Sequence, residues 1–589
     1  MVDFKEPWKI RIAGALNKLL LESGNTGLIE TAQIIVEIPP KLEMGDLGFP
    51  MFSFAKVLKK GPPCIAQGVA AKLAEEKRNS AEGTFTAEGP YVNVRLNRGK
   101  AAAEVLEKLL DEHTPYCRPE TLKGSRIMVE FSSPNTNKPL HLGHLRNDVL
   151  GESISRILKA CGAEVQKVCI INDRGIHICK SMLAYREHGE GKTPESEGIK
   201  SDHFVGNWYV KFSQMTQESP KAEEGAQEML RKWEAGDTET IALWKRMNHW
   251  TLEGMKETYR RTGISFDQYY FESETYLKGK NEILKALEQG IFHRAEDGSV
   301  WIDLTEEQLD KKVLLRKDGT SLYITQDIGT AIYRQQDWPF DHLVYVVGSE
   351  QQYHFKVLFT ILDKLGFGWA KNLYHLSYGM VNLRDGKMKS REGTVVDADA
   401  LLDSLKALAF KEIQRKEREN AVGDPEATAE KIALGALHYY LIQVSPVRDM
   451  LFNPQESLSF NGNTGPYLQY MGARISSLLR KDSQRNEGDL STGAFKPELL
   501  TSDAEWELLK TLESYPSLVA NAAAAMDPSL VAGYLYELSK GFSRFYHDCP
   551  ILRAENPDLA VSRLCLAQGA LRVLREALEL ICIPFLETM

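Results

Sequence analysis

Two histidines bracket a glycine at the start of a predicted helix. The segment HLGH, with His141, Gly143 and His144, follows a β-rich run at 127–131 and precedes a stretch with helical spacing of apolar residues. A helix N-terminus offers free backbone N–H groups and partial positive charge. Imidazoles would add hydrogen-bond donors, and the glycine would let a flat base approach the backbone. The segment therefore indicates a triphosphate site; a helix start with two internally bonded histidines is the alternative.

A cation-rich loop is the second candidate element. The segment DGKMKSREGT at 385–394 follows a β-rich run at 373–381 and contains Lys387 and Lys389. Such a loop beyond a strand can close over a phosphoryl group and neutralise charge that develops in a transition state. A solvated basic turn is the alternative for this loop alone. There is no GxGxxG motif, and the one P-loop look-alike has Arg186 where its first glycine is required, so any nucleotide must be held in another way.

Short β-rich runs alternate with helical patterns in the middle of the chain. They lie at 127–131, 165–171, 342–347 and 373–381. The alternation predicts a parallel, Rossmann-like sheet, and the polar stretch from about 186 to 240 is expected to be an insertion with helical pieces.

The two ends of the chain have different patterns. Residues 1–115 combine helical periods with the strand-like run PYVNVRLN at 90–97, and nearly everything after 400 has helical spacing. A chain of 589 residues is also too long for one core. We therefore expect a multidomain α/β protein. Its expected parts are an N-terminal α+β domain at 1–115, a Rossmann-like domain at 116–400 with an insertion around 186–300, a helical stem at 401–456 and an all-α helix bundle at 457–589.

Composition and cysteine usage narrow the class of protein. The chain is 43% hydrophobic and 26% charged, and no stretch is apolar for long enough to be a membrane span or signal peptide. Its eight cysteines contain no CxxC pair, which indicates reduced thiols rather than a zinc site or disulfide framework. A cytoplasmic protein without a membrane partner is expected.

The net charge of −9 disfavours a nucleic-acid partner only at first sight, because RNA binding needs no more than local basic surface. Two groups of cations could supply that surface, with a solvated helix face as the alternative for each. They are Lys56, Lys59 and Lys60, and Arg474, Arg480 and Lys481.

These motifs resemble those of a known family. HLGH is similar to the HIGH signature of class I aminoacyl-tRNA synthetases, and KMKSR resembles a degenerate KMSKS loop. Longer segments across the whole chain resemble the arginyl-tRNA synthetases in particular. They are AEGPYVNVRLN, VEFSSPNTNKPLHLGHLRN, LYITQDIGTAIYR, VVGSEQQYHF, FNGNTGPYLQYMGARI and YLYELSKGFSRFYHDCPIL.

The resemblance implies an arginine site that contains carboxylates. A guanidinium is permanently charged and has five donors in a planar fork, so carboxylates suit it. The resemblance places Glu130, Tyr323 and Asp327 around the side chain, and Ser133, Asn135 and Gln351 around the α-amino and carboxylate groups. No editing domain is expected, because buried carboxylates reject ligands that leave them unpaired.

The resemblance also implies an ATP site and a role for Lys138. The loop has Ser390 where KMSKS has its second lysine, and in many arginyl-tRNA synthetases a lysine just before HIGH is thought to substitute for it. The implied catalytic residues are Lys138, His141, His144, Lys387 and Lys389. The implied ATP contacts are His141, Gly143, His144, Gly348, Glu350 and the backbones of Met380 and Val381.

The implied reaction activates L-arginine with ATP, as its Mg²⁺ complex, and transfers it to the 3′-terminal ribose of tRNA(Arg) once that tRNA is bound. Neither a tightly bound metal nor an organic cofactor is expected, and a monomer is expected. The resemblance assigns elbow contacts to the N-terminal domain and the anticodon to the C-terminal helices, where Tyr534, Tyr536, Arg544 and Tyr546, with Phe542 and Phe545, could stack on bases or pack in the core. The rival hypotheses are another HIGH-type enzyme and an RNA-binding paralogue without catalysis.

Overall fold

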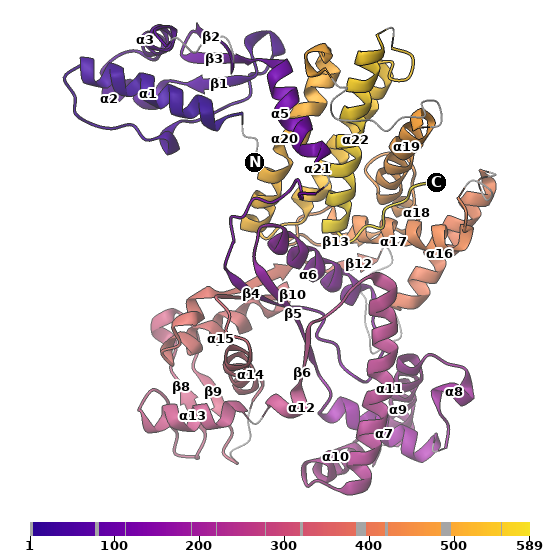
Figure 1. The fold of residues 1–589 in the computed structure, drawn as a ribbon. Coiled ribbons are helices and arrows are strands. Elements are labelled where there is room, and N and C mark those ends of the chain that lie inside the picture. The colour runs from indigo at the N-terminus through magenta and orange to yellow at the C-terminus, as the bar shows by residue number, and fades with distance from the viewer. Residues whose placement is uncertain are drawn as a thin grey trace. The chain divides into compact units, whose positions relative to one another are not determined.

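The computed structural model describes residues 4–76, 82–111, 113–189, 191–219, 221–276, 278–318, 322–383, 396–416, 418, 422–483, 496–554 and 556–589. The chain forms two compact units (Figure 1). The first comprises Met1–Arg118, Arg474–Ser517 and Tyr536–Arg575, and the second comprises Pro119–Ala473, Leu518–Leu535 and Glu576–Met589.

The first unit contains an antiparallel sheet with helices packed against it. The strands lie in the order β1 (Leu47–Pro50), β3 (Tyr91–Leu96) and β2 (Gly83–Glu88), and the helices are α1 (Glu6–Glu22), α2 (Ala55–Leu58) and α3 (Pro62–Ala74). Trp8, Ile12 and Leu16 bury one face of α1. This unit also includes α5 (Arg98–Leu110) and parts of α20 (Asp503–Ala525), α21 (Ser529–Asp548) and α22 (Pro557–Leu580). The Trp506 indole N–H donates to buried Asp46 over 2.7 Å, which joins α20 to the sheet.

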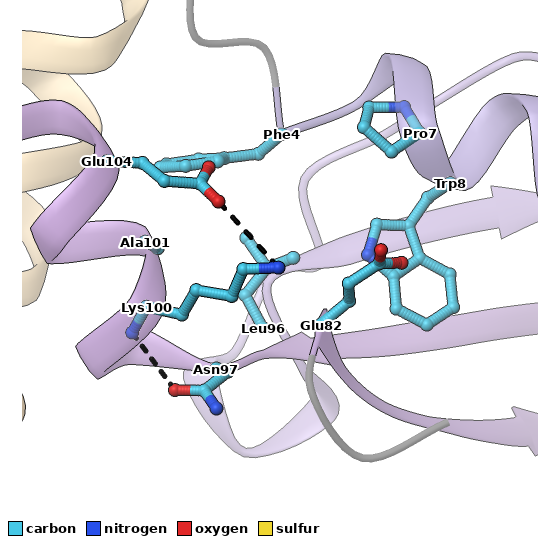
Figure 2. Close-up of a pocket in the computed structure, with 9 residues that line it drawn as sticks. All are labelled: Phe4, Pro7, Trp8, Glu82, Leu96, Asn97, Lys100, Ala101 and Glu104. Atoms are coloured by element: carbon cyan, nitrogen blue, oxygen red, sulfur yellow. Dashed lines mark hydrogen bonds and ion pairs between the residues drawn. The ribbon is translucent and has the colours of Figure 1, made fainter. Parts of the chain in front are cut away.

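A small pocket lies beside the N-terminus of α5 (Figure 2). Asn97 caps this helix by accepting a hydrogen bond from the Lys100 N–H over 3.1 Å, and the Lys100 ammonium lies 3.8 Å from the Glu104 carboxylate. The volume of about 100 Å³ is below the range of ordinary ligand sites. We therefore assign no ligand to this pocket.

The second unit is built on a five-stranded parallel sheet, as the alternating pattern predicted. The order is β11 (Leu373–Tyr378), β10 (His342–Gly348), β4 (Arg126–Glu130), β5 (Glu164–Ile171) and β6 (Gln268–Phe271). The first strand in sequence, β4, thus lies between β10 and β5, so the connections diverge there. In open parallel sheets, ligands bind beyond the carboxyl ends of the strands at such a point.

Helices surround this sheet (Figure 1). Close to it lie α6 (Leu142–Ala160), α14 (Tyr323–Asp337) and α15 (Gln352–Lys364). The insertion after β5 is helical, as predicted, and comprises α7 (Ile176–His188), α8 (Pro194–Glu197), α9 (Ser201–Glu218), α10 (Lys221–Glu234) and α11 (Thr238–Thr262). Met182, Tyr185 and Phe204 are buried in its own core.

The remaining elements complete the second unit. After β6 come α12 (Glu272–Thr275), α13 (Lys278–Glu288) and an antiparallel sheet of β7 (His293–Arg294), β8 (Val300–Ile302) and β9 (Lys312–Leu315). Short β12 (Val381–Leu383) pairs with β13 (Met450–Phe452), and the helices here are α16 (Ala398–Arg415), α17 (Pro425–Ile442), α18 (Pro454–Ser457) and the first part of α19 (Gly465–Ser483), up to Ala473. The C-terminal region is helical, as predicted. Among the helices that the structure describes, none is both long and apolar enough to span a bilayer.

Candidate active site

The two histidines of HLGH form a reciprocal cap on α6. His141 is the N-cap residue, and its Nδ1 accepts hydrogen bonds from the Gly143 N–H over 3.1 Å and the His144 N–H over 3.4 Å. His144 returns the interaction, because its Nδ1 accepts from the His141 N–H over 3.2 Å. With both Nδ1 atoms acting as acceptors, each neutral ring carries its proton on Nε2. Both rings can therefore donate to an anion at the helix N-terminus.

Burial, with a smaller effect of nearby positive charge, keeps both rings neutral. Burial, followed by the nearby Lys138 ammonium, lowers the pKa of His141 to about 4, and burial lowers the pKa of His144 well below its ordinary value. Burial also lowers the pKa of Lys138. Neither an ion pair nor a hydrogen bond joins the Lys138 ammonium to the described residues. A phosphate could therefore supply the countercharge.

Two consecutive serines follow β4 in an unusual backbone conformation. Ser132 and Ser133 have φ values of 71° and 51°, in the left-handed region that non-glycine residues rarely adopt. The Ser132 N–H donates to Asn147 on α6 over 2.5 Å, and its hydroxyl lies 2.6 Å from the Tyr259 hydroxyl. Asn147 also donates to the Val346 carbonyl over 2.8 Å. The surrounding elements therefore hold the strained turn in place beside the exposed Asn135.

Glu130 does not present a free carboxylate. It forms an ion pair with Arg334 of α14, and the two side chains are only 8% and 1% exposed. The Ser133 hydroxyl donates to the other Glu130 oxygen over 3.3 Å. An internal cation thus already neutralises the acid that was expected to meet a guanidinium.

Asp327 is more accessible. Its side chain is 40% exposed, and one oxygen lies 2.6 Å from Nε2 of His354, in the first turn of α15. Tyr323, one turn earlier on α14, is 78% exposed, and Gln351 is exposed in the short 3₁₀ helix Ser349–Gln351. Burial raises the pKa of Tyr345, and Glu130 and Asp327 add to this shift, whereas Arg334 opposes it.

Sequence reasoning missed one acidic residue here. Glu272 directly follows β6, and its side chain is 15% exposed and 3.9 Å from Arg174. Burial raises the pKa of Glu272 to about 7; Arg174 opposes this shift, whereas Asp173 and Asp327 add to it. Glu272 and Asp327 are therefore electrostatic neighbours. The only signal in the sequence was an acid at the end of a short strand, QYYF, that the alternating pattern did not reveal.

The expected ATP residues lie at two places along the sheet edge. Gly348 ends β10, and exposed Glu350 follows it. The Met380 N–H donates to Asp449 over 2.7 Å, and its carbonyl accepts from the Met450 N–H over 2.9 Å. Val381 is buried. Internal partners thus take up both backbone groups of Met380, contrary to the expected backbone contact, and its side chain, 38% exposed, is the part that a base can meet.

Arg146 of α6 fixes this region from inside. It is fully buried and donates to the carbonyls of Gly379, over 2.5 Å, and Arg448, over 2.8 Å. Arg146 therefore ties the helix that begins with HLGH to the segment around Met380. The expected catalytic Lys387 and Lys389 lie outside the described residues.

The aromatic residues of α21 divide into two groups. Phe542, Phe545 and Tyr534 are buried, so they pack in the core. Tyr536 is half-buried, whereas Tyr546 is 37% exposed, with the Arg474 guanidinium 4.3 Å from its ring centre. Arg544 is exposed and forms ion pairs with Glu507 and Asp548.

A larger pocket lies elsewhere in the second unit. It has a volume of about 360 Å³ and is lined by Glu412, Ile413, Lys416, Arg418, Ile432, Phe460, Asn461, Tyr470 and Met589. The Lys416 ammonium lies 3.8 Å from the centre of the Phe460 ring, and Tyr470 is 42% exposed. This volume falls in the range of small-molecule sites, and its aromatic and cationic walls suit a single nucleotide base.

Three family models match the chain. Residues 105–453 match the catalytic domain of class I (R) tRNA synthetases, residues 6–96 match the arginyl-tRNA synthetase N-terminal domain, and residues 468–589 match the DALR anticodon-binding domain. The chain belongs to the arginyl-tRNA synthetase family. Curated relatives agree over the full length. An arginine–tRNA ligase of Treponema denticola is 61% identical and one of Treponema pallidum 55% identical, each over 100% of both chains.

A solved structure has the same architecture as this synthetase chain. The arginyl-tRNA synthetase of Thermus thermophilus superposes with a TM-score of 0.80 at 26% identity, covering 99% of this chain and 100% of the other. The Plasmodium falciparum structure, at 19% identity and a TM-score of 0.77, agrees in fold over 99% of this chain and 98% of its own.

Proposed function

We propose that this chain is an ATP-dependent arginine–tRNA ligase. The observation that carries the proposal is one sheet edge with two contrasting sites. Neutral imidazoles that donate from Nε2 stand at the start of α6, and the acidic neighbours Asp327 and Glu272 stand beyond the strands. The first suits a triphosphate, and the second suits a guanidinium.

In the arginine site, Asp327 and Glu272 hold the guanidinium, and Tyr323 contributes its exposed ring. Glu130 acts indirectly. Arg334 holds its carboxylate, and that carboxylate accepts a hydrogen bond from the Ser133 hydroxyl and so orients it. Ser133, Asn135 and Gln351 hold the α-amino and carboxylate groups. This division assigns Asp327 and Glu272 to the substrate cation, with Arg174 3.9 Å from Glu272, and assigns Glu130 to the internal Arg334.

In the ATP site, His141, His144 and Lys138 bind phosphate oxygens, with Lys387 and Lys389 completing the set. Gly143, Gly348 and Glu350 face the nucleoside, and the exposed side chain of Met380 lies against the base, whereas Val381 is buried. The arginine carboxylate attacks the α-phosphorus in line, and pyrophosphate leaves. Bound Mg²⁺ enters with ATP and shares the phosphate charge; the protein needs no resident metal or organic cofactor.

The tRNA meets several surfaces, each within one unit. The pocket lined by Phe460, Tyr470 and Met589 takes an unpaired base of the tRNA; of its lining residues, Tyr470 and Met589 fall within the anticodon-binding family model over 468–589. In the first unit, Arg544, Tyr546 and half-buried Tyr536 form a separate contact surface for tRNA, whereas Tyr534 is buried in the core. Near the N-terminus, exposed Lys56, Lys59 and Lys60 follow Phe52, whose exposed ring packs edge-on against Tyr91, and they suit the tRNA elbow. We further propose a cytoplasmic monomer.

The deciding experiment is aminoacylation of bulk tRNA with each of the twenty amino acids supplied separately. Charging by arginine alone supports the proposal. Charging by a different amino acid would assign another specificity, and tRNA binding without charging by any would favour an RNA-binding paralogue.

A further inference from the structure

A cluster of charged residues joins the insertion to the start of α16. The Lys200 ammonium lies 2.7 Å from the Asp399 carboxylate and 3.1 Å from that of Asp202, and it donates to the Thr258 hydroxyl over 2.6 Å. Nε2 of His203 lies 3.2 Å from Asp399 and 3.4 Å from Asp397. Lys200 and His203 come from the insertion, and the carboxylate that they share, Asp399, comes from α16.

The cluster is not arranged for a metal ion. Asp202, His203 and Asp399 bring one ligand atom each within 4.8 Å of one another. The Lys200 ammonium, however, already contacts two of these three groups, and Arg261 adds a second permanent cation 3.8 Å from Asp399. A divalent cation would have to displace Lys200 and would meet strong repulsion. The protein itself supplies the countercharges.

The two carboxylates occupy a favourable place on α16. Asp397 is the N-cap residue, whose side chain accepts from the Ala400 N–H over 2.9 Å, and Asp399 lies in the first turn. The partial positive charge of a helix N-terminus stabilises both. Burial alone would raise the pKa of Asp399, but the hydrogen bonds from His203 and Lys200 outweigh it and hold that pKa below its ordinary value. Asp399 is therefore charged at neutral pH.

The backbone at the start of α16, residues 396–398, pairs with the backbone of residues 140–142. The Leu142 N–H donates to the Val396 carbonyl over 3.0 Å, and the Ala398 N–H donates to the Leu140 carbonyl over 3.1 Å. His141 and Asp397 thereby form an antiparallel bridge. A movement of the α16 N-terminus would carry the His141 backbone with it.

We infer that Lys200, His203 and Asp399 are positioning residues for the ATP site, since they fix the start of α16 and, through it, the backbone of His141. This inference rests on the proposed role of His141 in triphosphate binding. The insertion then contributes indirectly to catalysis, because its Lys200 and His203 hold Asp399 and so stabilise the pairing of 396–398 with 140–142. The Asp399 and Lys200 side chains are 16% and 21% exposed, so solvent screens their attraction only partly.

The test compares Asp399→Asn with Asp403→Asn. Both change one carboxylate of α16 to an amide, but Asp403 is 70% exposed and its described ion pair is with Arg261 alone. We expect Asp399→Asn to raise the KM for ATP about tenfold in pyrophosphate exchange with tRNA present, because a small misplacement of a binding group is enough for that loss. The KM values for arginine and tRNA should stay within about twofold, and Asp403→Asn should match the wild type.

A second measurement separates positioning from general damage. Hydrogen–deuterium exchange should become faster in peptides that cover 140–142 and 396–398 of Asp399→Asn, while peptides from α10 keep their protection. Unchanged KM for ATP together with unchanged exchange at 140–142 would overturn the inference, and so would an equal loss for all three substrates. A wild-type enzyme that fails to attach arginine to tRNA would refute the proposed function instead. Hydrogen–deuterium exchange would still show whether Asp399 stabilises the pairing of 396–398 with 140–142.

Discussion

Arg334 on α14 donates to Glu130 at the end of β4, and this ion pair lies in the interior of the second unit, with the two side chains 1% and 8% exposed. The Arg334 guanidinium also lies 5.0 Å from the centre of the Tyr270 ring. An enzyme proposed to select a guanidinium thus holds one of its own beside the site. The pair assigns Glu130 to the framework of the pocket and leaves substrate recognition to other acids.

Glu130→Gln should therefore act mainly on stability. Removal of one partner leaves the buried Arg334 charge uncompensated, which costs about 3 kcal/mol. The surface pair Glu282–Lys285, with the lysine 65% exposed, provides the control, because Glu282→Gln should cost at most about 1 kcal/mol. Urea unfolding followed by tryptophan fluorescence measures both. Equal midpoints for the two variants would contradict this account.

Asp327→Asn should weaken the binding of arginine and leave the binding of ATP unchanged. Loss of a charge-assisted hydrogen bond to the guanidinium should raise the KM for arginine about 10- to 100-fold, with the KM for ATP little changed. Citrulline, a neutral isostere, should be activated about 10⁴-fold less efficiently than arginine by the wild type. Activation of citrulline within tenfold of arginine would rule out a pocket of two carboxylates.

Glu272 should make arginine binding depend on pH. Burial first, and then Asp173 and Asp327, raise the pKa of Glu272 to about 7. In the free enzyme the Glu272 carboxyl is therefore mostly protonated below pH 7. The charged form attracts the guanidinium, and the KM for arginine should therefore fall as the pH rises through about 7. Glu272→Gln should remove this dependence and keep the high KM at every pH. A wild-type KM that is flat from about pH 6 to 8 would contradict the assignment.

The parallel sheet and the HLGH cap were predictable from sequence because their determinants are local. Alternating apolar runs fixed the strands at 127–131 and 342–347, and the helix start at His141 follows from its own short segment. Glu272 was not predictable, because its proximity to Asp327 arises from the packing of α12 against α14, which are about 50 residues apart in sequence. The Arg334–Glu130 pair likewise joins residues that no spacing rule connects. Helical spacing could not separate exposed Tyr546 from buried Phe545 either, since both occur in one aromatic run.

Asp148 on α6 should make the stability of the enzyme fall with rising pH. Burial, with Glu152 adding to it, raises the pKa of Asp148 from 3.8 to about 8, although Ser132 opposes the shift. The native state thus keeps a proton that the unfolded state releases above about pH 4, so this contribution to stability is present in acid and is lost as the pH rises to about 8. The Asp148→Asn variant has a side chain that is nearly the same shape as the carboxyl and does not titrate. Its melting temperature should therefore rise relative to the wild type by several degrees between about pH 5 and about pH 8. A constant difference across that range would show that Asp148 is charged in the native protein.

Lys138→Ala should remove most of the phosphate-stabilising charge at the ATP site. Its ammonium lies close enough to His141 and His144 to lower the pKa of both rings, and no ion pair with a described residue uses it. A phosphate that arrives there gains a cation without breaking an internal contact, so pyrophosphate exchange with tRNA present should fall by about 10²- to 10³-fold in kcat. Exchange by Lys389→Ala should fall by less, since we propose that Lys138 takes the role of the lysine that Ser390 replaces in the sequence of the loop. The matched control is Lys159→Ala in the last turn of α6, at the opposite end of the helix from HLGH, which should leave exchange unchanged. A Lys138→Ala enzyme as active as this control would remove Lys138 from the phosphate site and return the role to the loop.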